Sequence, residues 1–161
     1  MNNSLKKVLI YTDGACSGNP GTGGYGTLLI YNKYRKELSG GFRLTTNNRM
    51  EMMAAIVGLK TLNTKCDITL YTDSRYLVDA ITKGWAKKWR ANNWKRNKKE
   101  SAKNPDLWQQ LLDLCEKHEV NFVWVKGHAG HPENEYCDYL AVKASQQPNL
   151  PSDYVYETHI S

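Results

Sequence analysis

The sequence lacks the features of a secreted, membrane-spanning or disulfide-bonded protein. Its four cysteines, Cys16, Cys66, Cys115 and Cys137, have no paired spacing, which fits reduced thiols better than disulfides or a zinc cluster. The first apolar run is too short for a secretory signal, and no segment approaches the length of a membrane span. Internal repeats and linkers are also missing. We therefore expect a soluble, cytoplasmic, single-domain protein over the 161 residues.

Acidic residues are almost absent from the segment 83–103. It contains nine Lys or Arg residues against Glu100 alone, a local charge of +8 in a chain with a net charge of +6. The remainder of the chain is therefore slightly acidic, and a basic island of this kind usually binds a polyanion, most often nucleic acid. Because Trp85, Trp89 and Trp94 lie among the lysines, we expect both helix packing and an aromatic surface beside a phosphate-binding face. A merely solvated loop is the alternative.

Hydrophobic periodicity predicts an antiparallel start followed by alternating strands and helices. The predicted elements are strands at 5–11, 25–31 and 36–43, a helix with a capping box at 48–51, a strand at 67–72, a helix capped by Ser74, a helix from Pro105, a strand at 120–125 and a helix from about Pro132. This order predicts an α/β fold with a five-stranded mixed sheet, three antiparallel strands then two parallel, and helices on both faces. We expect a core over about 5–146, a basic helical protrusion at 83–103 and a weakly ordered tail at 147–161.

Two apolar runs are followed by nearly the same four residues, Tyr11-Thr12-Asp13-Gly14 and Tyr71-Thr72-Asp73-Ser74. Such runs are typical of buried strands, so both aspartates should lie at strand ends, where ligands gather in open sheets. Two carboxylates about 4 Å apart repel by roughly 4 kcal/mol at an effective dielectric near 20, so the pair needs a bound cation or a shared proton. The sequence therefore predicts a metal site.

Three further residues are candidates for this site, each with an ordinary structural alternative. Glu51 can complete a capping box, and an aspartate on a helix, such as Asp138, is usually a solvated surface residue. Both lie on the flank of the apolar stripe of their helices, so each can face along the sheet. His128 lies in a Gly-bearing loop, where a lone histidine is often an ordinary surface residue, but near several carboxylates it becomes a candidate proton carrier. A zinc site would need closer pairing than the neighbouring His and Cys residues offer.

The glycine-rich stretch 21–26 has the letters of the dinucleotide-binding pattern, GTGGYG. In that motif the glycines open a helix whose N-terminus faces the pyrophosphate. Here they lead into the strand-like residues 27–30, so we reject the nucleotide-binding interpretation and expect a tight turn.

Four motifs in one chain closely resemble bacterial ribonuclease H of type 1. They are Tyr-Thr-Asp-Gly-Ala-Cys-Ser-Gly-Asn-Pro-Gly, Thr-Thr-Asn-Asn-Arg-Met-Glu, Tyr-Thr-Asp-Ser, and Gly-His-Ala-Gly-His-Pro-Glu-Asn-Glu with Cys-Asp-Tyr-Leu-Ala. The resemblance runs from about Val8 to Ala144. It implies a monomeric endonuclease, with no obligatory protein partner, that cuts the RNA strand of RNA–DNA hybrids and leaves 5′-phosphates. It also implies two Mg²⁺ ions, replaceable by Mn²⁺.

The resemblance also implies roles for individual residues. Those for metal binding and catalysis are Asp13, Glu51, Asp73 and Asp138, with His128 assisting proton transfer or product departure. Those for substrate are Asn19, Asn47 and Asn48 in the minor groove, Thr46 and Asn104 near a DNA-strand phosphate, and Trp85, Lys87, Lys88, Lys95 and Lys98 in the protrusion. Two positions depart from close relatives, because Arg75 stands where they carry Gln and Leu44 replaces a basic residue.

Two other functions compete with this interpretation. One is a nucleic-acid binding module that retains the fold without catalysis and uses only its basic island. The other is a different polynucleotidyl enzyme with the same sheet, such as a DNA-processing nuclease. The intact set of carboxylates argues against the first, and the absence of an extra domain argues against the second.

Overall fold

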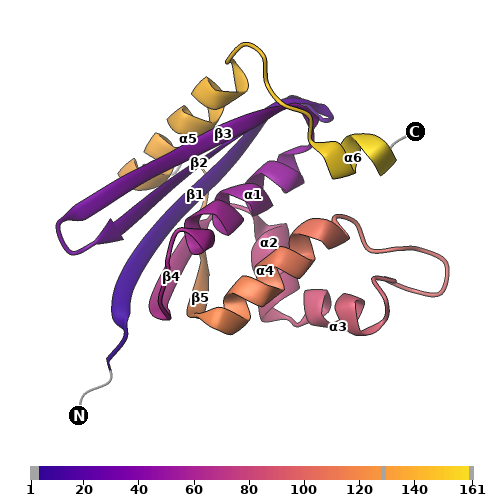
Figure 1. Cartoon of the computed structure of the whole chain (residues 1–161), viewed down its shortest axis with the longest axis horizontal. Helices are drawn as coiled ribbons and strands as arrows, with labels where there is room; N and C mark the ends of the chain where they lie inside the picture. Colours follow the sequence, from indigo (N-terminus) through magenta and orange to yellow (C-terminus); the bar gives the residue numbers. More distant parts are fainter. Residues whose placement is uncertain (1–3, 128–129, 160–161) are drawn as a thin grey trace.

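The computed structural model describes residues 4–127 and 130–159 and contains one five-stranded sheet flanked by helices (Figure 1). The strand order is β3-β2-β1-β4-β5, with antiparallel pairing from β3 to β1 and parallel pairing from β1 to β5. The predicted mixed sheet is therefore confirmed. The elements are β1 (Lys6–Gly18), β2 (Gly21–Tyr31), β3 (Tyr34–Thr45), α1 (Asn47–Lys60), β4 (Cys66–Thr72), α2 (Arg75–Thr82), α3 (Trp85–Ala91), α4 (Pro105–Lys117), β5 (Glu119–Trp124), α5 (Pro132–Ser145) and α6 (Tyr154–His159).

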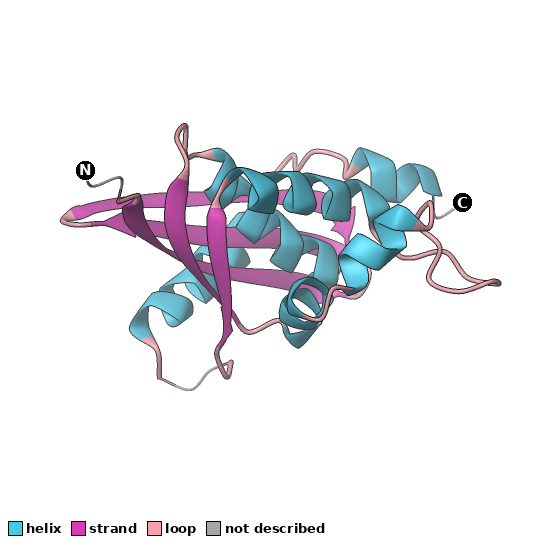
Figure 2. Ribbon diagram, turned by 90° about the horizontal axis from the view of Figure 1, so that it is seen from below, coloured by secondary structure: helices cyan, strands magenta, loops and turns pink. Residues whose placement is uncertain are grey.

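Helices cover both faces of the sheet, as predicted. Figure 2 shows α5 below the strands and the other long helices above them. The larger core lies between the sheet and the upper helices, where Ile10 and Ile68 from the strands meet Ile56 of α1 and Trp108 of α4. All four side chains are fully buried, and burial stabilises large apolar side chains of this size by about 1.5–3 kcal/mol each. This core fixes the strands whose ends carry the acidic residues.

Strand β1 is longer than the sequence predicts, and Asp13 lies within it rather than at its end. The parallel pairing with β4 stops at Tyr11, opposite Tyr71, but the antiparallel pairing with β2 continues through Asp13 to Gly18. Asp13 therefore lies where β1 has separated from β4. Asp73 comes directly after the last residue of β4, as expected.

The glycine-rich stretch 21–26 belongs to strand β2, so the predicted tight turn there is wrong. The turn instead occupies Asn19 and Pro20. A Cβ added to Gly24 would lie 2.2 Å from the carbonyl oxygen of Ala141, and one on Gly26 would lie 2.3 Å from that of Cys137. These glycines are needed because the backbone of α5 lies directly on β2. The rejection of a nucleotide-binding helix start agrees with this strand.

The first helix begins at a different cap from the one predicted. Thr46 is the N-cap of α1, and its hydroxyl accepts a hydrogen bond from the backbone N–H of Arg49 at 3.2 Å. The expected capping box at 48–51 is therefore wrong, and Glu51 is not a capping residue. The cap of α2 is confirmed, since the Ser74 hydroxyl accepts from the N–H of Leu77 at 3.1 Å.

The C-terminal tail contains a helix that the sequence analysis does not predict. Up to His159 it contains the short helix α6, which packs beside β3. Asp153, just before α6, is buried and forms an ion pair of 2.7 Å with Arg49 of α1. This ion pair ties the chain before α6 to the first long helix, while the weak order expected of the tail stays a prediction. No described helix has the length and apolar character required to cross a membrane.

Candidate metal centre and nucleic-acid interface

Three carboxylates from separate parts of the chain meet at one edge of the sheet. Asp13 comes from β1, Glu51 from α1 and Asp73 from the end of β4, and one oxygen of each lies within 4.8 Å of the others. Gly14 permits this approach, because a Cβ there would lie 2.6 Å from the backbone nitrogen of Glu51. Among residues 4–127 and 130–159, this is the one group of three or more acidic, His or Cys ligands that could hold a metal ion.

Asp138 of α5 lies on the outer side of this cluster. It lines the same small pocket as Asp13 and Asp73, but its carboxylate lies outside the group of three converging oxygens. The pocket is completed by Asn134 and Glu135 and by residues on both sides of the loop that precedes α5. Neither Asn134 nor Glu135 was predicted from the sequence. Asn134 lies four residues before Asp138, hence on the same face of a helix, and this spacing could have identified it.

The buried carboxylates perturb one another. Burial, followed by the charge of Asp73 and then that of Asp138, raises the pKa of Asp13 to about 8, although the backbone N–H of Gly14 donates to its Oδ1 at 2.9 Å. Burial also raises the pKa of Glu51 well above its ordinary value, with further contributions from Asp73 and Asp13. Without a cation, the cluster therefore retains protons near neutral pH. A divalent ion would replace them.

The residues present fit a hard divalent cation. Glu51 Oε1 and Asp73 Oδ1 are buried and have no hydrogen-bond partner among the described residues, and such oxygens normally require one. Carboxylate oxygens are the ligands that Mg²⁺ prefers. A zinc site fits less well, because the thiol of Cys137 is turned to the backbone oxygen of Tyr11, 3.2 Å away. This acidic cluster is consistent with divalent-metal dependence.

The predicted proton carrier, His128, lies outside the described residues. Gly127 and His131, on either side of it in the sequence, both line the acidic pocket, so the chain enters and leaves this loop beside the carboxylates. A Cβ on Gly127 would lie 2.8 Å from Asp73 Oδ2, so a glycine at this position leaves room for the Asp73 carboxylate. The role of His128 stays a prediction.

The predicted contacts for the minor groove and the DNA-strand phosphate lie together. The Asn19 side-chain oxygen accepts from the N–H of Asn47 at 3.1 Å, and the Asn104 side-chain oxygen accepts from Arg49 at 3.2 Å. A cleft of about 750 Å³ is lined by Asn19, Thr46, Asn48 and Asn104, among other residues. Four of the residues expected to contact the substrate therefore lie around one cleft.

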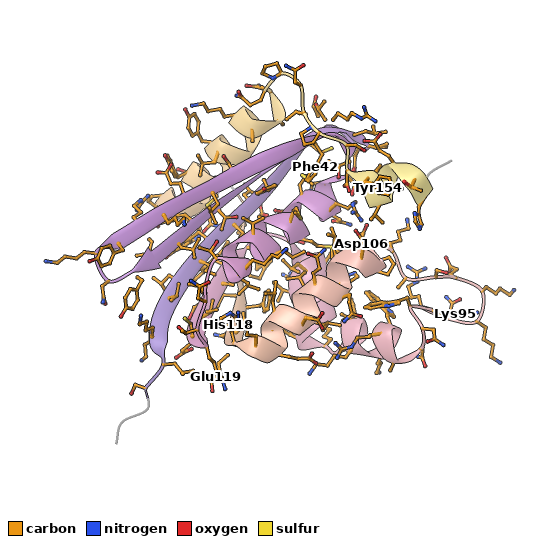
Figure 3. The ribbon with its side chains drawn as sticks, in the orientation of Figure 1. Phe42, Lys95, Asp106, His118, Glu119 and Tyr154 are labelled. Carbon is orange, nitrogen blue, oxygen red and sulfur yellow. The ribbon has the colours of Figure 1, made fainter. Side chains whose placement is uncertain are left out.

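The basic segment projects from the body of the molecule. Lys87, Lys88, Lys95 and Lys98 are exposed, and Figure 3 shows Lys95 on the loop that extends away from the sheet. Trp89 packs against buried Trp108, with ring centroids 6.0 Å apart. Trp85 stays 38% exposed, so the segment has both the helix packing and the aromatic surface expected. A second cleft of about 470 Å³ reaches from Trp85 to Asn48.

Comparison with known proteins decides between the functional classes. The family model described as RNase H matches residues 5–146. The chain belongs to the RNase H family. It is 84% identical over 157 residues to a ribonuclease H of Rippkaea orientalis, covering 98% of this chain and 96% of that protein. It is 70% identical to a ribonuclease H of Desulforamulus reducens, covering 94% of this chain and 96% of that protein.

Solved RNase H structures share the fold. LC9-RNase H1, described as a type 1 RNase H with the type 2 active-site motif, superimposes with a TM-score of 0.80 at 32% identity, covering 99% of this chain and 83% of that one. Membership in the RNase H family makes the chain a nuclease of the hydrolase class that degrades RNA in RNA–DNA hybrids endonucleolytically. The family depends on divalent metal. A catalytically silent binding module is therefore the weaker interpretation.

Proposed function

We propose that this chain hydrolyses the RNA strand of RNA–DNA hybrids with two Mg²⁺ ions held by Asp13, Glu51, Asp73 and Asp138. The observation that carries the proposal is the convergence of three carboxylates within 4.8 Å, of which Asp13 and Glu51 are buried and Asp73 is half-buried. Glu51 Oε1 and Asp73 Oδ1 have no hydrogen-bond partner among the described residues. Such a concentration of negative charge is costly unless cations neutralise it. Mn²⁺ can replace Mg²⁺ because it accepts the same oxygen ligands.

The carboxylates divide the work at the reacting phosphate. Asp13 and Asp73 hold the inner positions, Glu51 closes the buried side, and Asp138 at the rim faces the incoming substrate. Two bound Mg²⁺ ions would supply an activated water and stabilise the charge on the leaving 3′-oxygen, which gives a 5′-phosphate product. We assign proton transfer and product departure to His128, whose loop begins beside Asp73.

Substrate binding involves the two clefts and the protrusion. Asn19, Asn47 and Asn48 are proposed to contact the minor groove of the hybrid, where 2′-hydroxyl groups distinguish RNA from DNA. Thr46 and Asn104 receive a phosphate of the DNA strand. Phosphates farther along the duplex are bound by Trp85, Lys87, Lys88, Lys95 and Lys98, through ionic contacts and the exposed aromatic surface. We further propose that the enzyme is a cytoplasmic monomer that needs no protein partner.

A cleavage assay tests this proposal directly. We expect Mg²⁺-dependent cutting of a labelled RNA strand paired with DNA, products with 5′-phosphate ends, and no cutting of RNA duplex or DNA duplex. A chelator should abolish cleavage, and added Mn²⁺ should restore it. Equal cleavage of all three duplexes, or cleavage that persists in the chelator, would contradict the proposal.

A further inference from the structure

One exposed tryptophan contacts both sides of the segment that carries Asp73. Trp124 is the last residue of β5 and pairs with Thr72 at the end of β4. Its indole N–H donates to the backbone oxygen of Asp73 at 3.1 Å. The guanidinium carbon of Arg75 lies 4.2 Å from the centroid of the Trp124 ring. A single ring therefore binds the residue before Ser74 by a hydrogen bond and the residue after it by a cation–π contact.

These contacts restrain a part of the chain that the sheet no longer holds. Ladder pairing between β4 and β5 ends at Thr72 and Trp124, so Asp73 is the first residue outside it. The N–H of Val125 still donates to the oxygen of Thr72 at 2.9 Å, and the N–H of Ser74 donates to the hydroxyl of Thr72 at 3.1 Å. The indole N–H adds the missing restraint on the carbonyl of Asp73 itself.

The exposure of this pair argues against a role in general packing. Trp124 keeps 39% of its surface exposed, and Arg75 is also exposed. Within the described part of the chain, no carboxylate forms an ion pair with Arg75, so its charge is directed to the ring. An exposed cation–π pair adds only about 0.5–1 kcal/mol to stability. Its location beside a metal ligand is the notable feature.

We propose that Trp124 and Arg75 are positioning residues that hold the Asp73 carboxylate in the geometry required for metal binding. The inference rests on the proposed metal role of Asp73. Trp124 fixes the Asp73 carbonyl through its N–H, and Arg75 holds the indole plane in the orientation that makes this bond. A metal ligand that is free to rotate must lose that freedom on binding, so a fixed backbone raises metal affinity. Residues that hydrogen-bond to a metal ligand without touching the metal typically affect metal affinity severalfold or more.

Two substitutions separate the parts of this device. Trp124→Phe keeps an aromatic ring for Arg75 but removes the N–H donor, and Arg75→Gln removes the cation but leaves the indole. Calorimetric titration of Mn²⁺ into the protein without nucleic acid should show affinity about three- to tenfold weaker for Trp124→Phe, the factor expected for one hydrogen bond. Arg75→Gln should weaken it about two- to fivefold. The double variant should lose less than the product of the two factors, because both act through one ring.

Three further measurements distinguish positioning from structural or substrate-binding roles. Thermal unfolding without metal should change little, and hybrid affinity in excess chelator should not change. In the wild-type protein, the Trp124 indole N–H should exchange slowly with solvent by NMR, and Arg75→Gln should accelerate this exchange. Lys6→Gln is the matched control. Lys6, the first residue of β1, has its Nζ 5.6 Å from the ring centroid of Tyr31, so this variant also removes a cation–π contact. We expect this variant to leave metal affinity unchanged.

The outcomes are decisive in each direction. If the wild-type protein binds Mn²⁺ and both variants bind it within twofold of the wild-type affinity, only the positioning role is overturned. An Arg75→Gln variant that weakens hybrid affinity in chelator, with unchanged metal affinity, makes Arg75 a nucleic-acid contact and also overturns it. If Trp124→Phe does not fold, Arg75→Gln and the indole exchange rate decide. A wild-type protein that binds no Mn²⁺ would instead contradict the metal role of Asp73.

Discussion

Asp13 has a large share in the electrostatic strain of the acidic cluster proposed to bind metal. Only 8% of its surface is exposed, and its carboxylate shares the site with Glu51 and Asp73. Its pKa is raised to about 8 from an ordinary value of 3.8. Between these two pH values the folded protein retains a proton that the unfolded chain has released. The stability of the metal-free protein should therefore fall as pH rises through this range.

Replacement of Asp13 by Asn tests both the metal role and the cost of this buried charge. Asp13→Asn removes a proposed metal ligand, so we expect hybrid cleavage near background, while hybrid affinity in chelator is largely retained. The same change removes the buried charge, so the metal-free variant should be more stable than the wild type at pH 8 and should lose less stability between about pH 4 and pH 8. Cleavage assays and thermal unfolding across this pH range measure the two effects.

Added Mg²⁺ is the control for the stability effect. It should raise the melting temperature of the wild type at pH 8 and leave that of Asp13→Asn nearly unchanged, because binding to the native state stabilises it. Wild-type turnover in Asp13→Asn would refute the metal assignment. If the melting temperature of the metal-free wild type rises between about pH 4 and pH 8, the buried charge of Asp13 does not destabilise the protein.

At the scale of single residues, the acidic residues of the site could be predicted from the sequence, but the capping role considered for Glu51 was wrong. The two Tyr-Thr-Asp segments indicated Asp13 and Asp73, because each follows an apolar strand, and two like charges at neighbouring strand ends need a cation or a shared proton. Glu51 had a competing explanation as a capping residue. Thr46 caps the helix instead, and only the contact of α1 with β1 at Gly14 shows where Glu51 points. Such a contact depends on the assembled sheet, which one strand or helix cannot reveal.

At the scale of elements, one buried arginine joins the first long helix to α4 and to the chain before α6. Arg49 is 3% exposed. Its guanidinium donates to both carboxylate oxygens of Asp106 at 3.0 and 2.7 Å and to both of Asp153 at 2.7 and 3.0 Å. The Thr45 hydroxyl adds a bond of 2.7 Å to Asp153. Figure 3 shows Asp106 at the end of α4 that faces α1.

Removal of Asp153 should therefore destabilise the whole fold. Asp153→Ala leaves Arg49 buried with half of its charge compensation and leaves Thr45 without its acceptor. Breaking a buried ion pair in this way typically costs about 3–5 kcal/mol of unfolding free energy. Urea denaturation measures this loss. Glu157→Ala is the control because it removes the pair of Glu157 with Arg43, whose side chain is 62% exposed, and it should have little effect. Equal small losses in both variants would show that the network does not hold the tail.

Most elements could be predicted from the sequence, whereas α6 and the ion pair that precedes it could not. The apolar periodicity of the strands and the starts of α4 and α5 at Pro105 and Pro132 are local signals. The ion pair of Asp153 with Arg49 joins residues 104 positions apart, and no local pattern marks it. For the same reason β2 was predicted too short, since the role of its glycines is apparent only when α5 lies on them.

At the scale of the whole molecule, charge is divided between two regions. The acidic cluster of Asp13, Glu51 and Asp73 lies at the sheet edge, while the segment 83–103 carries nine basic residues on a projection. The clefts that run from Trp85 by way of Asn48 to Asn19 lie between the protrusion and the sheet. In the proposed function, the protrusion binds the phosphates of the duplex while one strand reaches the carboxylates. Binding and catalysis should be separable by mutation.

The protrusion should determine how strongly hybrid binding depends on salt concentration, and it should not affect the chemical step. Replacement of Lys87, Lys88, Lys95 and Lys98 by Ala should weaken hybrid binding and reduce the slope of log K against log salt concentration by about 0.9 for each phosphate that the variant no longer neutralises. KM should rise while kcat changes little, because the carboxylates are untouched.

The control is a second quadruple variant at the other end of the sheet, in which the exposed lysines Lys6, Lys7, Lys33 and Lys36 are replaced by Ala. It removes the same charge and should leave the slope nearly unchanged. If both quadruple variants lower the slope equally, net charge rather than the protrusion attracts the hybrid. If neither does, the basic segment does not contact phosphates.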